Sequence, residues 1–215
     1  ADEIVIVGAH YDTYDLTPGA DDNATGVAGV LELARLMADH RPERTLRFVL
    51  FGTEEPPFFN TDAMGSRVYA SRARRADENI VAMYSLEMLG YFSDEPGSQH
   101  HPPPLQLFYP SQGNFIAFVG NPDSGRLLRR SLARFRDVGA AVPSEGMVSS
   151  SVVPGVELSD HASFWRHGCP AVLISETGPF RNLEYHLGSE TADRLDFARM
   201  ARIVAGMMRV VEAEA

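Results

Sequence analysis

Pro18-Gly19-Ala20-Asp21-Asp22-Asn23-Ala24-Thr25-Gly26 is a stretch in which two adjacent carboxylates lie among glycines and other small residues. It follows the apolar run Ile4-Val5-Ile6-Val7, which ends in Gly8-Ala9-His10-Tyr11-Asp12, and it leads into apolar residues at helical spacing. We expect the stretch to connect the first strand of a sheet to the first helix. Because a histidine and three acids lie so close in the chain, we also expect a functional site there.

The composition is that of an ordinary globular protein. At 215 residues the chain fits one medium domain, residues 1–215, with 44% hydrophobic and 22% charged residues. The net charge of -10 argues against nucleic acid and anionic membranes as partners, because both need basic patches. Cys169 is the only cysteine, which excludes a disulfide framework and a cysteine-based metal site. We find no signal peptide and no apolar run near the ~18 residues of a membrane span.

Apolar periodicity predicts strands that alternate with helices. We expect strands at 3–9, 45–51, 79–86, 114–119 and 171–175, and helices at 25–39, 62–76, 123–137, 160–167 and 197–211. The proline-rich segment 93–104, with His100 and His101, is expected to be an exposed loop, and so is the segment 139–159. This order of elements predicts an α/β sheet with helices on both faces.

Histidine and acidic residues follow the first three predicted strands. His10, Asp12 and Asp22 come after the first strand. Glu54 and Glu55 come after the second, and Glu87 ends the third. In such sheets the functional site lies at the carboxyl ends of the strands, so we expect these side chains to share one edge of the sheet.

A histidine with several carboxylates and no cysteine suits zinc or another divalent first-row metal. Two cations about 3.5–4 Å apart need a bridging ligand, and a carboxylate has the two oxygens for it. Asp21 and Asp22 are adjacent, so we expect one to bridge and the other to face away. His10 and Asp12 project to the same side of an extended segment, so Asp12 can orient the imidazole. Of Glu54-Glu55, one can bind metal while the other accepts a proton from water.

Together these residues resemble a known family. His10-Tyr11-Asp12, the stretch from Gly19 to Gly26, Glu54-Glu55 and Tyr185-His186 look like the signature of the M28 family of di-zinc aminopeptidases. The resemblance runs over nearly the whole chain. It implies a three-layer α/β/α fold of the zinc-exopeptidase (phosphorylase/hydrolase-like) type with a mostly parallel mixed central sheet. It also implies a cis peptide bond between Asp22 and Asn23.

The resemblance further implies a role for each matching residue. One zinc ion is bound by His10 and Glu87, the other by Glu55 and His186, and Asp22 bridges the two. Glu54 is the general base and then the general acid, Asp12 supports His10, and Tyr185 hydrogen-bonds the oxyanion.

The function implied is hydrolysis of N-terminal residues from peptide substrates by a water or hydroxide that bridges two zinc ions. Two alternatives stay open. Glutaminyl cyclases share the fold but use one zinc ion and cyclise N-terminal glutamine without water. Other relatives keep the fold as non-catalytic binding modules.

Some residues leave a choice or depart from the pattern. His161 and His186 are both candidates for the last ligand, and the family pattern of Tyr-His before an acidic turn favours His186. Glu87 replaces the aspartate of many members, and Leu187 replaces the usual hydroxyl residue. Because the chain opens almost directly on a core strand, we expect sequence upstream of it and a fold that lacks the family's N-terminal part.

Overall fold

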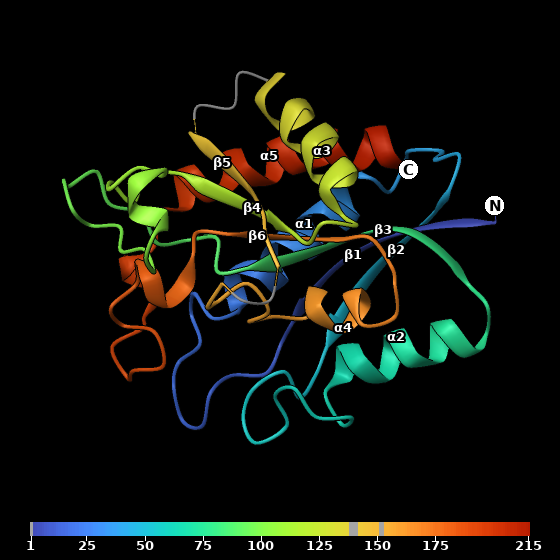
Figure 1. The fold of residues 1–215 in the computed structure, drawn as a ribbon, viewed down its shortest axis with the longest axis horizontal. Helices are drawn as coiled ribbons and strands as arrows, with labels where there is room; N and C mark the ends of the chain where they lie inside the picture. Colours follow the sequence, from blue (N-terminus) through green and yellow to red (C-terminus); the bar gives the residue numbers. More distant parts are fainter. Residues whose placement is uncertain (1, 138–141, 151–152) are drawn as a thin grey trace.

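The computed structural model describes residues 2–137, 142–150 and 153–215. Within these residues six strands form one sheet in the order β2-β1-β3-β6-β4-β5 (Figure 1). The strands are β1 (Glu3–His10), β2 (Thr45–Phe51), β3 (Asn79–Glu87), β4 (Ile116–Gly120), β5 (Ser144–Val148) and β6 (Ala171–Ser175). The helices are α1 (Ala24–Leu36), α2 (Gly65–Arg75), α3 (Gly125–Asp137), α4 (His161–Trp165) and α5 (Phe197–Glu214).

The sheet is mixed and mostly parallel, as predicted. β1 pairs in parallel with β2 and β3, and β3 pairs in parallel with β6. β4 runs antiparallel to β6, and β5 runs parallel to β4. β1 lies inside the sheet and is buried from Ile4 to His10. This burial explains why its sequence is a continuous apolar run, without the alternation of a strand that has one face in water.

The prediction that 139–159 is one long loop is wrong for its central part, where β5 forms. Residues 144–148 are Ser-Glu-Gly-Met-Val, and their polar residues and glycine give little sign of a strand. β5 is an edge strand that pairs with β4. The backbone hydrogen bonds to β4 therefore outweigh the weak local preference. Residues 139–141 and 151–152 of the same segment lie outside the described residues.

Helices cover both faces of the sheet and complete the predicted three layers. α1, α3 and α5 pack on one face, and α2 and α4 pack on the other (Figure 1). Leu33, Phe135 and Met207 bring the first group of helices into one apolar core, while Ala70 and Phe164 bring the second group into another. Among the described residues, each helix is too short or too polar to cross a membrane.

Candidate metal centre

Most of the predicted site residues meet where β1, β2 and β3 end. His10 is the last residue of β1 and Glu87 the last residue of β3. Glu54 and Glu55 follow β2 after a two-residue connection. All four side chains are buried. The parallel strands thus bring to one edge of the sheet residues that are as much as 77 positions apart.

Asn23 fastens the acidic stretch to the end of β3. Its side-chain oxygen caps α1 by accepting a hydrogen bond from the Gly26 N–H (3.1 Å) and also accepts one from Met88 (3.1 Å). Its amide donates to the carbonyl of Leu86 (2.9 Å). A Cβ at Gly26 would lie 2.4 Å from that same carbonyl oxygen, so only glycine fits. The peptide bond between Asp22 and Asn23 is cis, as the family resemblance implied.

Asp21 and Asp22 face different surroundings, as expected for adjacent residues. The Asp21 carboxylate accepts a hydrogen bond from the backbone of Gly90 (2.9 Å), and burial raises its pKa to about 7. Asp22 instead faces two imidazoles. Its Oδ1 lies 3.2 Å from Nε2 of His10, and its Oδ2 lies 3.1 Å from Nε2 of His186. Of the pair, Asp22 is the one placed to bridge two groups.

The first group contains His10, Glu87 and one oxygen of Asp22. Nε2 of His10 lies 3.2 Å from Oε2 of Glu87. The longer side chain of Glu87, compared with aspartate, is held by Ser159, whose hydroxyl donates to Oε2 (2.6 Å). Ser159 is a contact that sequence reasoning did not find.

The second group contains His186, Glu55 and the other oxygen of Asp22. Nε2 of His186 lies 3.3 Å from Oε1 of Glu55. The rings of Tyr14 and Tyr185 both stack on His186, with centroids 4.1 Å and 3.7 Å from its own. The backbone of His186 has a φ of 61°, in the left-handed region that residues other than glycine seldom adopt. The imidazole is therefore held by its neighbours. Tyr14 was not among the predicted site residues.

Asp12 contacts more than the sequence predicted. Its backbone carbonyl lies 3.1 Å from Nδ1 of His10, and its carboxylate oxygen lies 3.6 Å from the same nitrogen. The two carboxylate oxygens also accept hydrogen bonds from the backbone N–H groups of Glu54 (3.1 Å) and Glu55 (3.0 Å). Asp12, two residues after the end of β1, thus orients the histidine of the first group and the backbone of both glutamates that follow β2.

Glu190 is a buried acid that sequence reasoning missed. Its Oε1 accepts hydrogen bonds from the backbone N–H groups of Asp21 (2.8 Å) and Asp22 (2.6 Å). It therefore fixes the backbone that carries the bridging carboxylate. The acidic turn after Tyr185-His186 was a signal for it in the sequence, but nothing there linked this turn to residues 168 positions away.

His161, the other candidate for the last ligand, has a different environment. It is fully buried, its Nε2–H donates to the carbonyl of Val156 (2.8 Å), and its ring meets the ring of Trp165 edge-on at 4.5 Å. Burial lowers its pKa to about 4, opposed by that hydrogen bond. His161 is thus held as a neutral core residue, which favours His186 as the ligand.

The environment of His161 predicts a pH dependence of stability. The folded protein binds this proton only below a pH of about 4, whereas the unfolded chain binds it below about 6.5. The free energy of unfolding should therefore fall by about 3 kcal/mol between pH 6.5 and 4 because of this one group. In buffer that contains a metal chelator, the His161→Gln variant should lose less stability than the wild type over this pH range, as measured by urea unfolding. His100→Gln, at an exposed position, is the control and should follow the wild type; equal slopes for all three proteins would contradict the assignment.

The cluster carries more negative than positive charge inside a buried space. Burial would raise the pKa of Asp22, but hydrogen bonds with His10 and His186 lower it to about 2. Burial and the neighbouring Asp22 raise the pKa of Glu55 to about 7. For His10, burial lowers the pKa, yet Glu87 and the other nearby carboxylates raise it well above its usual value. The raised pKa values of Glu55 and His10 both report an excess of carboxylates, which a cation would relieve.

The donor set fits zinc. Ligand atoms of His10, Asp22 and Glu55 all lie within 4.8 Å of one another. Oε1 of Glu55 is buried and makes no hydrogen bond, although it lies 3.3 Å from the His186 nitrogen. This unpaired oxygen beside an imidazole nitrogen is available to a metal ion, and imidazole and carboxylate are both ligands that zinc accepts. The residues present therefore fit a divalent metal.

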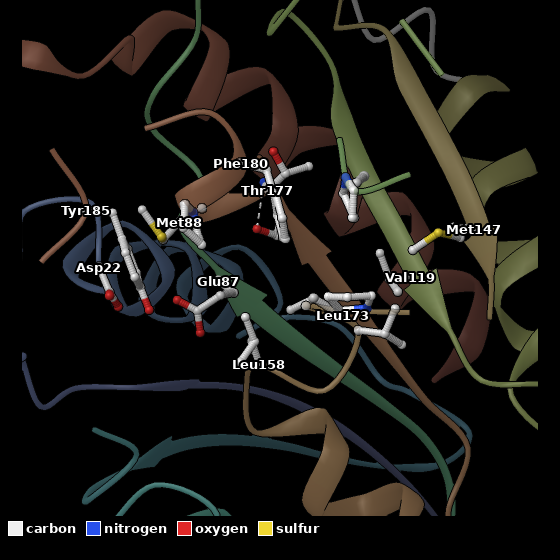
Figure 2. A pocket seen from close by; sticks show the side chains of 18 of the residues that line it. Asp22, Glu87, Met88, Val119, Met147, Leu158, Leu173, Thr177, Phe180 and Tyr185 are labelled. Atoms are coloured by element: carbon white, nitrogen blue, oxygen red, sulfur yellow. Dashed lines mark hydrogen bonds between the residues drawn. The ribbon is translucent and has the colours of Figure 1, made fainter. Parts of the chain in front are cut away.

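A cavity of about 210 Å³ opens from this cluster. Figure 2 shows Asp22, Glu87 and Tyr185 at one end of it. The other end is apolar and is formed by side chains that include Val119 and Leu173. His101, from the loop predicted to be exposed, is half-buried and also lines the cavity, whereas His100 is exposed. The cavity thus joins an acidic end to an apolar end.

The sequence of the chain matches a known protein family. Residues 1–211 match the family described as Peptidase family M28. A protein of Escherichia coli (strain K12) described as uncharacterized protein YfbL is 40% identical over 220 residues, which cover 97% of this chain and 66% of that protein. The chain thus spans slightly less than two thirds of this relative's length.

Two solved structures share the fold. The zinc aminopeptidase BSAP from Bacillus subtilis matches with a TM-score of 0.72 and 21% identity, over 99% of this chain and 46% of that one. The glutaminyl cyclase of Fimbriiglobus ruber matches with a TM-score of 0.65 and 20% identity, over 98% of this chain and 71% of that one. These likenesses confirm the predicted fold class.

Proposed function

The chain belongs to peptidase family M28, and from this membership we propose that it is a metal-dependent exopeptidase that removes N-terminal residues from peptides. One observation carries the proposal. The Asp22 carboxylate lies between two groups of side chains, each with one histidine and one glutamate. This arrangement supports a site for two metal ions that share a ligand.

The proposed cofactor is a pair of zinc ions. His10 and Glu87 would hold one ion and Glu55 and His186 the other, with Asp22 shared between them. When bound, the two ions lower the pKa of a water molecule and polarise the carbonyl of the scissile peptide bond.

Glu54 is the proposed general base and then general acid. Its side chain lines the cavity, and its carboxylate lies 4.0 Å from Nε2 of His10. Burial raises its pKa well above the usual value, against the effect of His10. A carboxylate with a raised pKa suits proton exchange near neutral pH, so Glu54 can take a proton from water and return it to the leaving amine. Asp12, which holds the Glu54 N–H, positions this carboxylate.

Tyr185 is the proposed hydrogen-bond donor to the oxyanion. It lies beside Asp22 and Glu87 at the acidic end of the cavity (Figure 2). Burial, together with the charges of Asp22 and Glu87, raises its pKa above the usual value. Its hydroxyl therefore stays protonated and is able to donate to negative charge that develops on the substrate carbonyl.

The charge of the cavity supports an aminopeptidase over a carboxypeptidase. Among the described residues, the cavity is lined by several carboxylates and by neither arginine nor lysine. Bound zinc ions would offset the carboxylates that hold them, so the useful observation is the missing side-chain cation. A peptide's terminal carboxylate would find no arginine or lysine to pair with in this lining.

A single-zinc glutaminyl cyclase activity is the second candidate, because the cyclase from Fimbriiglobus ruber has the same fold. The two histidines on either side of Asp22 favour the two-metal hydrolase. A binding module without catalysis is a weaker alternative, because each proposed ligand position holds a competent donor.

Metal content and product decide between these functions. The chelator-treated protein is titrated with zinc, and metal per chain is counted together with hydrolysis of aminoacyl amides and cyclisation of a glutaminyl peptide. We expect two zinc ions per chain and release of the N-terminal residue. One zinc ion with a pyroglutamyl product would favour the cyclase, and zinc-loaded protein that converts neither substrate would contradict catalysis.

A further inference from the structure

The apolar end of the cavity is one face of the last three strands of the sheet. Val119 of β4, Met147 of β5 and Leu173 of β6 point into it (Figure 2). Val119 is in register with both of the others, so the three side chains form a continuous apolar floor. The neighbouring register row, two residues along each strand, lies on the same face because strands alternate sides with a period of two residues.

That neighbouring row connects the metal centre with a second carboxylate. Glu87 of β3 is in register with Ser175 of β6, Ser175 with Ala117 of β4, and Ala117 with Glu145 of β5. All four residues line the cavity. Glu145 is therefore three strands from Glu87, or about 14 Å at the usual spacing between strands.

Glu145 has no charged partner among the described residues. The nearby hydroxyl of Tyr109 donates to the carbonyl of Gly146 (3.2 Å). Burial and the charge of Glu145 raise the pKa of Tyr109, which is a sign of how close the two groups are. Arg136 of the adjacent helix α3 binds the backbone and hydroxyl of Ser144, which faces the other side of β5. A half-buried carboxylate at the otherwise apolar end of the cavity is thus left for a ligand.

We propose that Glu145 selects peptides whose N-terminal residue is arginine or lysine. This inference rests on the proposed function, which places the N-terminal residue of the substrate at the metal centre. An arginine side chain extends about 7 Å from its Cα at standard bond lengths, which is about half of the distance between Glu87 and Glu145. The side chain of Glu145 and a hydrogen bond of about 3 Å cover part of the remainder. Its methylene groups lie on the floor of Val119, Met147 and Leu173, and its guanidinium meets the carboxylate.

The test compares arginine with citrulline, which has the same shape without the charge. We expect the zinc-loaded enzyme to hydrolyse arginyl amides with a kcat/KM about 10–100-fold above citrullyl amides, as for a hydrogen bond to a charged group. Glu145→Gln should bring this ratio close to one and leave hydrolysis of norleucyl amides unchanged, which also shows that the variant is folded. Glu157→Gln removes the same charge at an exposed neighbouring position outside the cavity and should keep the wild-type ratio.

A binding measurement separates this inference from the proposed function. Calorimetry with argininamide and citrullinamide, on zinc-loaded protein with and without Glu145→Gln, does not depend on turnover. If no amide is hydrolysed but argininamide binds more tightly through Glu145, the proposed function fails and the inference stands. Equal treatment of arginine and citrulline by the wild type, or a preference that survives Glu145→Gln, overturns the inference while hydrolysis supports the function.

Discussion

Glu54→Gln is expected to lower kcat by about 10²–10⁴-fold, the contribution of a positioned general base. The amide keeps the size of the side chain but cannot accept a proton from water. Asp12 holds position 54 through the backbone N–H, so the substitution leaves that contact in place. Steady-state hydrolysis of a norleucyl amide by zinc-loaded protein measures the effect.

Zinc content distinguishes this role from that of the adjacent residue. Glu54→Gln should keep the metal stoichiometry of the wild type, whereas Glu55→Gln should reduce it. The Glu55 carboxylate lies 3.3 Å from Nε2 of His186, whereas that of Glu54 lies 4.0 Å from Nε2 of His10. Activity close to the wild type would assign the proton transfer to another residue, and loss of zinc from Glu54→Gln would make Glu54 a metal ligand.

Arg181→Met is expected to lower the free energy of unfolding by about 3–5 kcal/mol, the effect of removing one partner of a buried ion pair. The side chains of Arg181 and Glu176 are both completely buried and lie 3.5 Å apart. The guanidinium also donates to Oε1 of Gln99 (2.8 Å) and to the carbonyl of Phe115 (2.8 Å). The substitution leaves the buried carboxyl group of Glu176 without its neighbouring charge, and it leaves the two acceptors without their donor. Urea unfolding in a chelator measures the loss.

The double variant Arg181→Met, Glu176→Leu is the control. It removes both charges together, so its stability should lie nearer to the wild type than that of the single variant. A single variant that loses less than about 1 kcal/mol, the typical value of an exposed pair, would show that the two charges contribute little.

The sequence predicted those parts of the molecule that local patterns determine. The run that becomes β1 is buried on both faces, and His10 and Glu87 end strands whose apolar pattern is clear. Parallel pairing then brings such strand ends together, so the shared edge could be foreseen. That these residues bind zinc, and that residues 1–215 form one domain, stay predictions.

Other features depend on contacts that no local pattern records. β5 forms because its backbone pairs with the neighbouring strand β4, although Ser-Glu-Gly-Met-Val has little preference for a strand. Glu190 gains its role from two backbone N–H groups far away in the chain. Nothing in the sequence distinguishes Glu145 from the other acidic residues, and only the register of the strands places it in the cavity. Each depends on tertiary pairing.

The Asp22 carboxylate contacts His186, which lies 164 positions after it in the chain. His10, Asp22 and Glu87 are synthesised early. Glu190, which fixes the Asp22 backbone, is added about a hundred residues after Glu87. The two halves of the proposed site can therefore meet only when synthesis of this region is nearly complete. A nascent chain that stops before residue 186 would therefore hold one histidine of the proposed site and lack the other.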